Sequence, residues 1–171
     1  MTNVLAIANR FIMLARQDGR SFNTQQLMKL CIIAQGMHLT IYHKKMFNEK
    51  IEAWKLGTVV PKLYKVLKPF RGNPITEPVK SWRFLLWDNY LSDAEQAVVQ
   101  MVYENFGYLD GTTLSMMTNQ REIYKQSGDM ANKENFEVTH NSLLSFFYDK
   151  VISIQHLADQ AKFIKQNYCV V

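Results

Sequence analysis

The sequence predicts a mainly α-helical fold: a single helical domain with a central buried helix and a small β-hairpin. Apolar residues recur at helical spacing along most of the chain. The segment 24–42 is apolar on every side, and such a helix has to be surrounded by others. Gly36 costs this helix about 1 kcal/mol against Ala, so it indicates a close crossing with a neighbour. After it, over residues 46–54, short alternating runs are typical of strands.

Length and composition indicate one globular domain. The chain has 171 residues, of which 47% are hydrophobic and 20% charged, as in ordinary globular proteins. No apolar run approaches the ~20 residues that cross a bilayer, and Asn9 and Arg10 interrupt the N-terminal apolar pattern, unlike a secretory signal. The two thiols, Cys31 and Cys169, indicate a reducing compartment rather than a disulfide framework. We therefore expect a cytoplasmic protein with no membrane partner.

Capping signals divide the first half of the chain. Thr2 is the expected N-cap of a first helix, which Asp18-Gly19 ends. Asn23 and Gln26 form the pattern of a capping box for the second helix. These signals predict two helices joined by a short connection.

A hairpin and a third helix are expected next. Met46-Phe47 and Ile51–Trp54 are the strand candidates, separated by three polar residues. Gly57 then breaks the chain, and Pro61 stands at the first position of a helix. The pattern over residues 79–87 fits either a strand or a short helix.

The second half predicts three more helices. Ser92 and Glu95 form a capping box for a helix that Gly107 ends, and Asp110 caps a shorter one. The last of the three is a long helix that starts after Thr139. The apolar stripe of this helix continues to Ile164. Before the helix, the sequence predicts a polar loop over 126–135 and an edge strand over 136–138.

Positive charge is concentrated between His43 and Arg71. This region holds eight Lys or Arg and two Glu, a net charge of +6, whereas the whole chain carries +5. The region is either a solvated face or a docking surface for an acidic partner, protein or nucleic acid. Trp54 and Tyr64 either form part of a binding hot spot or pack the hairpin against the helices. The candidate partner-binding residues are Lys50, Trp54, Lys55, Lys62, Tyr64, Lys65 and Lys68.

No pattern of catalytic, cofactor-binding or metal-binding residues stands out. His38 and His43 are five apart and would point away from each other on a helix. The serines lack a nucleophile elbow, the glycines are scattered rather than clustered into a phosphate-binding loop, and Cys31 is best interpreted as a core residue. We predict no enzymatic activity, no cofactor and no metal.

A helix-turn-helix is an alternative interpretation of the first two helices. Thr24, Gln25, Gln26 and Lys29 would then head the recognition helix. Two facts disfavour it: the connection is longer than the usual three or four residues, and the second helix is apolar on every side. Weak electrostatic binding of nucleic acid by the basic region stays open and would be salt-dependent.

The central segment resembles the Panacea domain, which is found in phage-associated GepA-type proteins and in antitoxins such as SocA. The family pattern is K-L-x-x-x-A-Q-G, a Tyr and a Lys, then F-x-E-x-I-E-A-W-x-x-G-P-V-V-P-x-x-Y. The matching residues are Lys29, Leu30, Ala34, Gln35, Gly36, Tyr42, Lys44 or Lys45, Phe47, Glu49, Ile51, Glu52, Ala53, Trp54, Gly57, Val59, Val60, Pro61 and Tyr64. The later L-S-x-x-E helix start matches Leu91, Ser92 and Glu95. Thr58 replaces the family's proline, and the His and Trp of its T-H-x-E-x-x-W element are absent.

The resemblance implies a Panacea-like antitoxin domain over residues 1–150, and we expect residues 151–171 to be a C-terminal helical extension packed on it. It also implies a non-enzymatic antitoxin of a toxin–antitoxin system, which neutralises a cognate protein toxin by direct binding. Such a protein either masks its toxin or also delivers it to a cellular protease. The alternative is a phage-associated or mobile-element-associated regulatory or interaction protein, with or without nucleic-acid binding. An unrecognised enzyme is the third hypothesis.

Overall fold

The structure is a computed structural model, and it describes residues 2–55, 57–79, 91–118, 136–153 and 155–168. The α-helices are α1 (Val4–Gln17), α2 (Thr24–Tyr42), α3 (Pro61–Leu67), α4 (Asp93–Phe106), α5 (Gly111–Met117), α7 (His140–Ser153) and α8 (Gln155–Asn167), with a 3-10 turn η1 (Lys68–Phe70) after α3. The strands are β1 (Glu52–Trp54), β2 (Gly57–Val59) and β3 (Phe136–Glu137). The fold is therefore mainly α-helical, as predicted.

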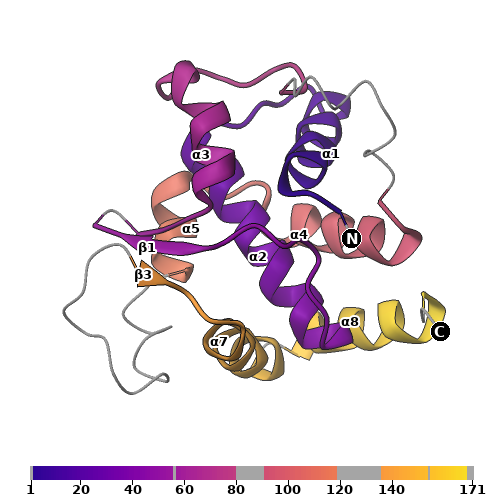
Figure 1. Cartoon of the computed structure of the whole chain (residues 1–171). Coiled ribbons are helices and arrows are strands. Elements are labelled where there is room, and N and C mark those ends of the chain that lie inside the picture. The colour runs from indigo at the N-terminus through magenta and orange to yellow at the C-terminus, as the bar shows by residue number, and fades with distance from the viewer. Residues whose placement is uncertain (1, 56, 80–90, 119–135, 154, 169–171) are drawn as a thin grey trace.

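Helix α2 lies at the centre of the molecule, with the other helices arranged around it (Figure 1). It contacts α1, α3, α4, α5, α7 and α8. From Leu27 to Leu39 every residue of α2 is buried. The prediction of a central buried helix is confirmed, and the reason is physical: an apolar surface on all sides has to be covered on all sides.

Most of the predicted helix boundaries are confirmed by capping contacts. Asn23 and Gln26 form a reciprocal capping box at α2, and Ser92 and Glu95 form another at α4. The prediction that Thr2 caps α1 is wrong, because the Asn3 side chain accepts the free backbone N–H groups of the first turn. A short side-chain amide in extended backbone is an equally good cap.

The hairpin lies further along the chain than predicted. Strand β1 pairs antiparallel with β2 on one side and with β3 on the other, and Thr58 lies opposite Ala53. The predicted strand at Met46-Phe47 does not join this sheet; Phe47 forms an isolated parallel bridge with Thr2. The backbone N–H and carbonyl of Phe47 form hydrogen bonds with the Gln35 side chain of α2, so they do not pair with residues 51–54. The predicted edge strand near residue 136 is confirmed as β3.

The prediction of one long C-terminal helix is wrong. Helix α7 ends at Ser153 and α8 begins at Gln155. Helix α8 contacts α2, α4 and α7, so its apolar residues, such as Leu157 and Ile164, are buried against the domain. Burial of these residues against α2, α4 and α7 favours the separate placement of α8.

Two sequence-based predictions fall mainly outside the described residues. Of the segment 79–87, only Val79 is described, and the polar loop over 126–135 lies entirely in the part that is not. Among the described helices, none combines the length and the apolar character needed to cross a bilayer.

Candidate partner-binding surface

A buried lysine of α2 holds strand β2 in place. The side chain of Lys29 is only 3% exposed, and its Nζ donates hydrogen bonds to the carbonyl O (2.8 Å) and Oγ1 (3.2 Å) of Thr58. Gly57 has φ 118°, and a Cβ there would lie 2.9 Å from Lys29 Nζ. Glycine is therefore favoured at 57 by the backbone conformation, and a side chain there would also displace the Lys29 ammonium. Thr58, which replaces the proline of the family pattern, supplies a hydroxyl acceptor to the ammonium group.

A buried amide of α2 holds the segment before the sheet. Oε1 of Gln35 accepts hydrogen bonds from the backbone N–H groups of Met46 (2.9 Å) and Phe47 (3.1 Å), and its Nε2 donates to the carbonyl of Phe47 (3.1 Å). Buried backbone groups need such partners. One side chain therefore replaces the strand pairing that the sequence predicted for these two residues.

A third polar contact lies near the C-terminal end of α2. Nδ1 of His38 lies 2.8 Å from the carbonyl O of Lys44. Because a carbonyl oxygen only accepts, Nδ1 carries the hydrogen and donates this bond. Burial lowers the pKa of His38, which favours the neutral ring. We call Lys29, Gln35 and His38 the α2 clamp, because together they hold residues 44–47 and strand β2 against α2.

The aromatic pair of the candidate surface joins β1 to α3. The rings of Trp54 and Tyr64 are 5.1 Å apart with an interplanar angle of 73°, an edge-to-face contact. Nε1 of Trp54 donates to the Glu52 carboxylate at 2.8 Å. Both rings are half-buried. They pack the sheet against α3, as one of the two interpretations of the sequence expected. Part of each ring also stays exposed, as a binding role requires.

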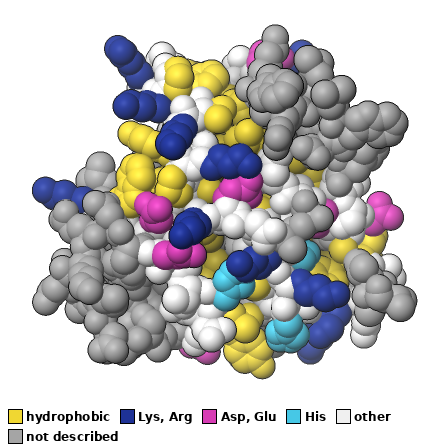
Figure 2. Space-filling view, viewed as in Figure 1, with side chains coloured by type: hydrophobic (Ala, Val, Ile, Leu, Met, Phe, Trp, Pro, Cys, Tyr) yellow, Lys and Arg dark blue, Asp and Glu magenta, His cyan; other side chains and the backbone are white. Residues whose placement is uncertain are grey.

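The lysines of the surface differ in how their charge is compensated. Nζ of Lys62 lies 2.6 Å from the Glu49 carboxylate, and Nζ of Lys50 lies 2.8 Å from the Glu137 carboxylate. Lysines 55, 65 and 68 are exposed, and no carboxylate of the described residues forms an ion pair with them. Figure 2 shows the basic side chains gathered over α3, with acidic and basic groups side by side lower on the same face.

We use the name α3 face for the seven residues predicted as the candidate surface. Its members come from three places: the segment before β1, strand β1 with the residue that follows it, and helix α3 with the start of η1. They are Lys50, Trp54, Lys55, Lys62, Tyr64, Lys65 and Lys68. The α2 clamp and the aromatic pair hold these elements together, so the surface is preorganised.

The start of α2 is not available to read DNA bases. Lys29 is buried in the clamp, Gln25 donates to Ser115 Oγ (2.9 Å), and Gln26 closes the capping box and donates to the carbonyl of Leu109 (3.0 Å). Thr24 Oγ1 lies 3.4 Å from the carbonyl of Leu67. A recognition helix has to leave its N-terminal side chains free for a groove. The geometry of α2 therefore does not match the helix-turn-helix alternative.

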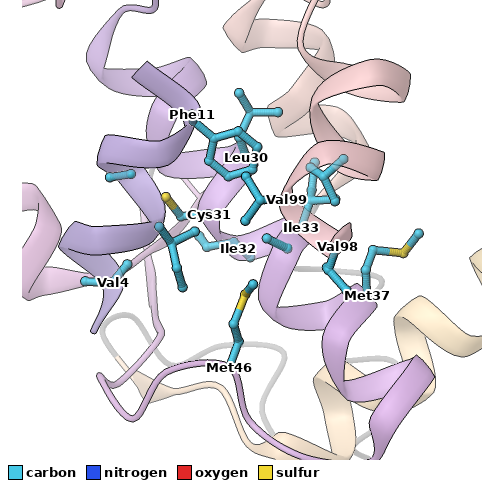
Figure 3. Close-up of a cluster of buried hydrophobic side chains, with 14 of the residues drawn as sticks. Val4, Phe11, Leu30, Cys31, Ile32, Ile33, Met37, Met46, Val98 and Val99 are labelled. Carbon is cyan, nitrogen blue, oxygen red and sulfur yellow. The ribbon is translucent and has the colours of Figure 1, made fainter. Parts of the chain in front are cut away.

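Cys31 is a core residue, as interpreted from the sequence. It is fully buried, and burial raises the pKa of its thiol. Figure 3 shows it within the cluster of apolar side chains to which α1, α2 and α4 contribute. Among the described residues, no group of three or more His, Cys, Asp or Glu is placed to hold a metal ion.

The α2 clamp was not predicted from the sequence, although a signal for it exists. Lys29, Gln35 and His38 are the polar side chains of the segment 27–39, which is otherwise apolar. A buried polar group is costly unless it is hydrogen-bonded, so each of them had to have a partner. The sequence does not state which segment supplies those partners.

These features define a class of protein: a mainly α-helical domain in which a buried central helix holds a small sheet beside a lysine-rich surface. A family model described as antitoxin SocA-like, Panacea domain, matches residues 27–125, more than half of the chain. The chain belongs to this family, and the matched region contains the α2 clamp and the α3 face. Comparisons with curated proteins and with solved structures gave no match.

Proposed function

We propose that this protein is the antitoxin of a toxin–antitoxin system, and that it neutralises a cognate protein toxin by direct binding, without an enzymatic reaction of its own. The observation that carries the proposal is membership of the SocA-like antitoxin family over residues 27–125. The α3 face supports it, because a preorganised surface with exposed lysines and partly exposed aromatic rings has the composition of a protein-binding site.

The α3 face favours a toxin with an acidic surface. Lys65 and Lys68 are exposed on one side of α3 and its continuation, where a complementary negative patch would accelerate association and select the correct partner. The half-buried rings of Trp54 and Tyr64 would supply apolar contact area beside these charges.

Co-expression with the neighbouring small reading frame tests the proposal. If that frame encodes the toxin, its expression alone stops growth and this protein restores it. We expect the double variant Lys65→Glu/Lys68→Glu to lose rescue and to raise the Kd for the purified toxin at least tenfold. The matched control is Lys162→Glu/Lys165→Glu, which reverses two exposed lysines on α8 and should rescue normally.

Two outcomes separate the parts of the proposal. Failure of the wild-type protein to bind or silence any neighbouring toxic product would contradict the antitoxin function. Full rescue by the α3 variant would retain the function and exclude the α3 face. The amount of toxin in rescued cells distinguishes masking, which leaves the toxin intact, from delivery to a protease, which lowers its level.

The second candidate function is that of a regulatory protein that binds nucleic acid. The exposed lysines of the α3 face favour it, since Lys side chains neutralise phosphates. Gel shifts at physiological salt test it: binding that the α3 double variant abolishes and the α8 double variant preserves would support this alternative. The absence of any shift at that salt concentration would exclude it.

A further inference from the structure

Helices α4 and α8 form the two walls of an open groove of about 480 Å³. The α4 wall presents Met101 and Glu104, and the α8 wall presents Asp159 and Phe163, each drawn from one face of its helix. The α4 residues that line it extend from Ala97 to Glu104, which is two helical turns, or roughly 11 Å. The groove lies apart from the α3 face, whose residues are not among those that line it.

An aromatic side chain stands exposed in this groove. Phe163 is 61% exposed, although the neighbouring Ile164 is buried in the same helix. Tyr168 also lines the groove and is 37% exposed. Removing exposed apolar surface from water is favourable. A partner that covers Phe163 would bury the part of its surface that the free protein leaves exposed.

The charge of the groove is opposite to that of the chain. Two of the residues that line the groove are carboxylates, in a protein with a net charge of +5. Glu104 and Asp159 line the groove, and no Lys or Arg is among its lining residues. The lysines of α8, Lys162 and Lys165, lie outside the lining. The groove therefore complements a ligand that is apolar on one side and cationic at its edges.

We propose that the α4–α8 groove binds a basic amphipathic helix of a partner protein. Apolar side chains at i, i+3 and i+4 of that helix contact Phe163, and flanking Lys or Arg side chains face Glu104 and Asp159, which is the helix-in-groove mode of recognition. A second copy of this chain is the competing occupant, and the sedimentation experiment below distinguishes it from a partner helix. The proposal does not depend on the antitoxin function.

The test uses two fluorescein-labelled helical peptides of about 14 residues with leucines at i, i+3, i+4 and i+7. One carries Lys at the remaining positions and the other carries Glu. By fluorescence anisotropy at low salt, we expect the Leu–Lys peptide to bind the full-length protein at least tenfold more tightly than the Leu–Glu peptide. This order is opposite to what the net charge of the protein alone would produce.

Variants locate the site. Phe163→Ser should weaken binding of the Leu–Lys peptide at least tenfold. The matched control is Met116→Ser, because Met116 is 64% exposed on α5 and lies outside the groove; it should leave the Kd unchanged. The double variant Glu104→Gln/Asp159→Asn should weaken binding and reduce its dependence on salt. Thermal melts confirm that each variant is folded.

Three results would overturn the proposal. They are equal binding of the two peptides, an unchanged Kd for folded Phe163→Ser, and a concentration-dependent dimer of the wild type in sedimentation velocity that Phe163→Ser abolishes. The last would assign the groove to a second copy. Toxin rescue by Phe163→Ser is a separate measurement, so failure of the groove proposal and failure of the antitoxin proposal are distinguishable.

Discussion

At the scale of single residues, the most unusual group is the ammonium of Lys29. It is buried at 3% exposure, and its bonds run to Thr58, a neutral residue. Burial lowers its pKa from 10.5 to about 8, because the charged form loses its hydration. Two hydrogen bonds partly compensate that loss, and they place β2 against α2.

Lys29 makes the stability of the protein depend on pH. Its folded-state pKa of about 8 lies below the unfolded value of 10.5, so the unfolded state binds more protons between these values. The contribution of Lys29 to the free energy of unfolding therefore rises with pH across this window, by about 1.4 kcal/mol per pKa unit and on the order of 3 kcal/mol in total. Below pH 8 the penalty of the buried charge is fully present.

Urea unfolding of the wild type and of Lys29→Met measures this contribution. The free energy of unfolding of the wild type relative to the variant should increase between pH 7.5 and pH 10. Taking the difference removes the contribution of groups that titrate in both proteins. Tyr103 is one of them, because burial raises its pKa. A difference that stays constant over this range would show that Lys29 titrates normally.

At the scale of elements, the crossing of α2 and α7 depends on the absence of a side chain at Gly36. The ring of Phe147 occupies the space in which a Cβ of residue 36 would lie. Both residues are buried. The glycine that appears unfavourable for an isolated helix is therefore favourable in the folded protein, because it lets the two helices approach closely.

Gly36→Ala should destabilise the protein. Helix propensity alone would favour Ala by about 1 kcal/mol, but overpacking against Phe147 costs typically 1–3 kcal/mol, and the clash with the ring decides the sign. In a Phe147→Leu background the same substitution should cost less, since the smaller side chain leaves room. Denaturant unfolding of the four proteins gives the coupling free energy, and additive effects would contradict the contact.

At the scale of the whole molecule, α2 connects the helices of the described fold and strand β2. It contacts six other helices and strand β2, and its own surface is almost completely buried. Helix α8, in contrast, lies at the periphery and exposes Phe163. Because local opening of α2 would disrupt most of the core, it should occur only with global unfolding.

Hydrogen exchange tests this hierarchy. We expect the amides of residues 27–39 to exchange last, with a protection free energy equal to the global free energy of unfolding, and those of α8 to exchange earlier. Mass spectrometry of peptic fragments measures both in one experiment. Exchange of α2 as fast as that of α8 would show that α2 is not the centre of the cooperative unit.

Several features followed from local sequence alone. An all-apolar segment required a buried helix, and the capping boxes at Asn23 and Ser92 placed the starts of α2 and α4, because these signals act within four residues of each other. The family motif between Lys29 and Tyr64 pointed to the Panacea domain for the same reason: its residues are close in sequence. The lysines of the candidate surface were also visible as a local excess of charge.

Only the tertiary structure decided where the polar side chains of α2 find their partners. Gln35 accepts hydrogen bonds from the backbone N–H groups of Met46 and Phe47. The hairpin therefore lies further along the sequence than the strand pattern predicted. The break between α7 and α8 and the groove beside α4 likewise depend on which apolar faces meet. The physical reason is the same in each case: capping and periodicity act between near neighbours in sequence, whereas burial and hydrogen-bond pairing are decided between segments that meet only in the folded chain.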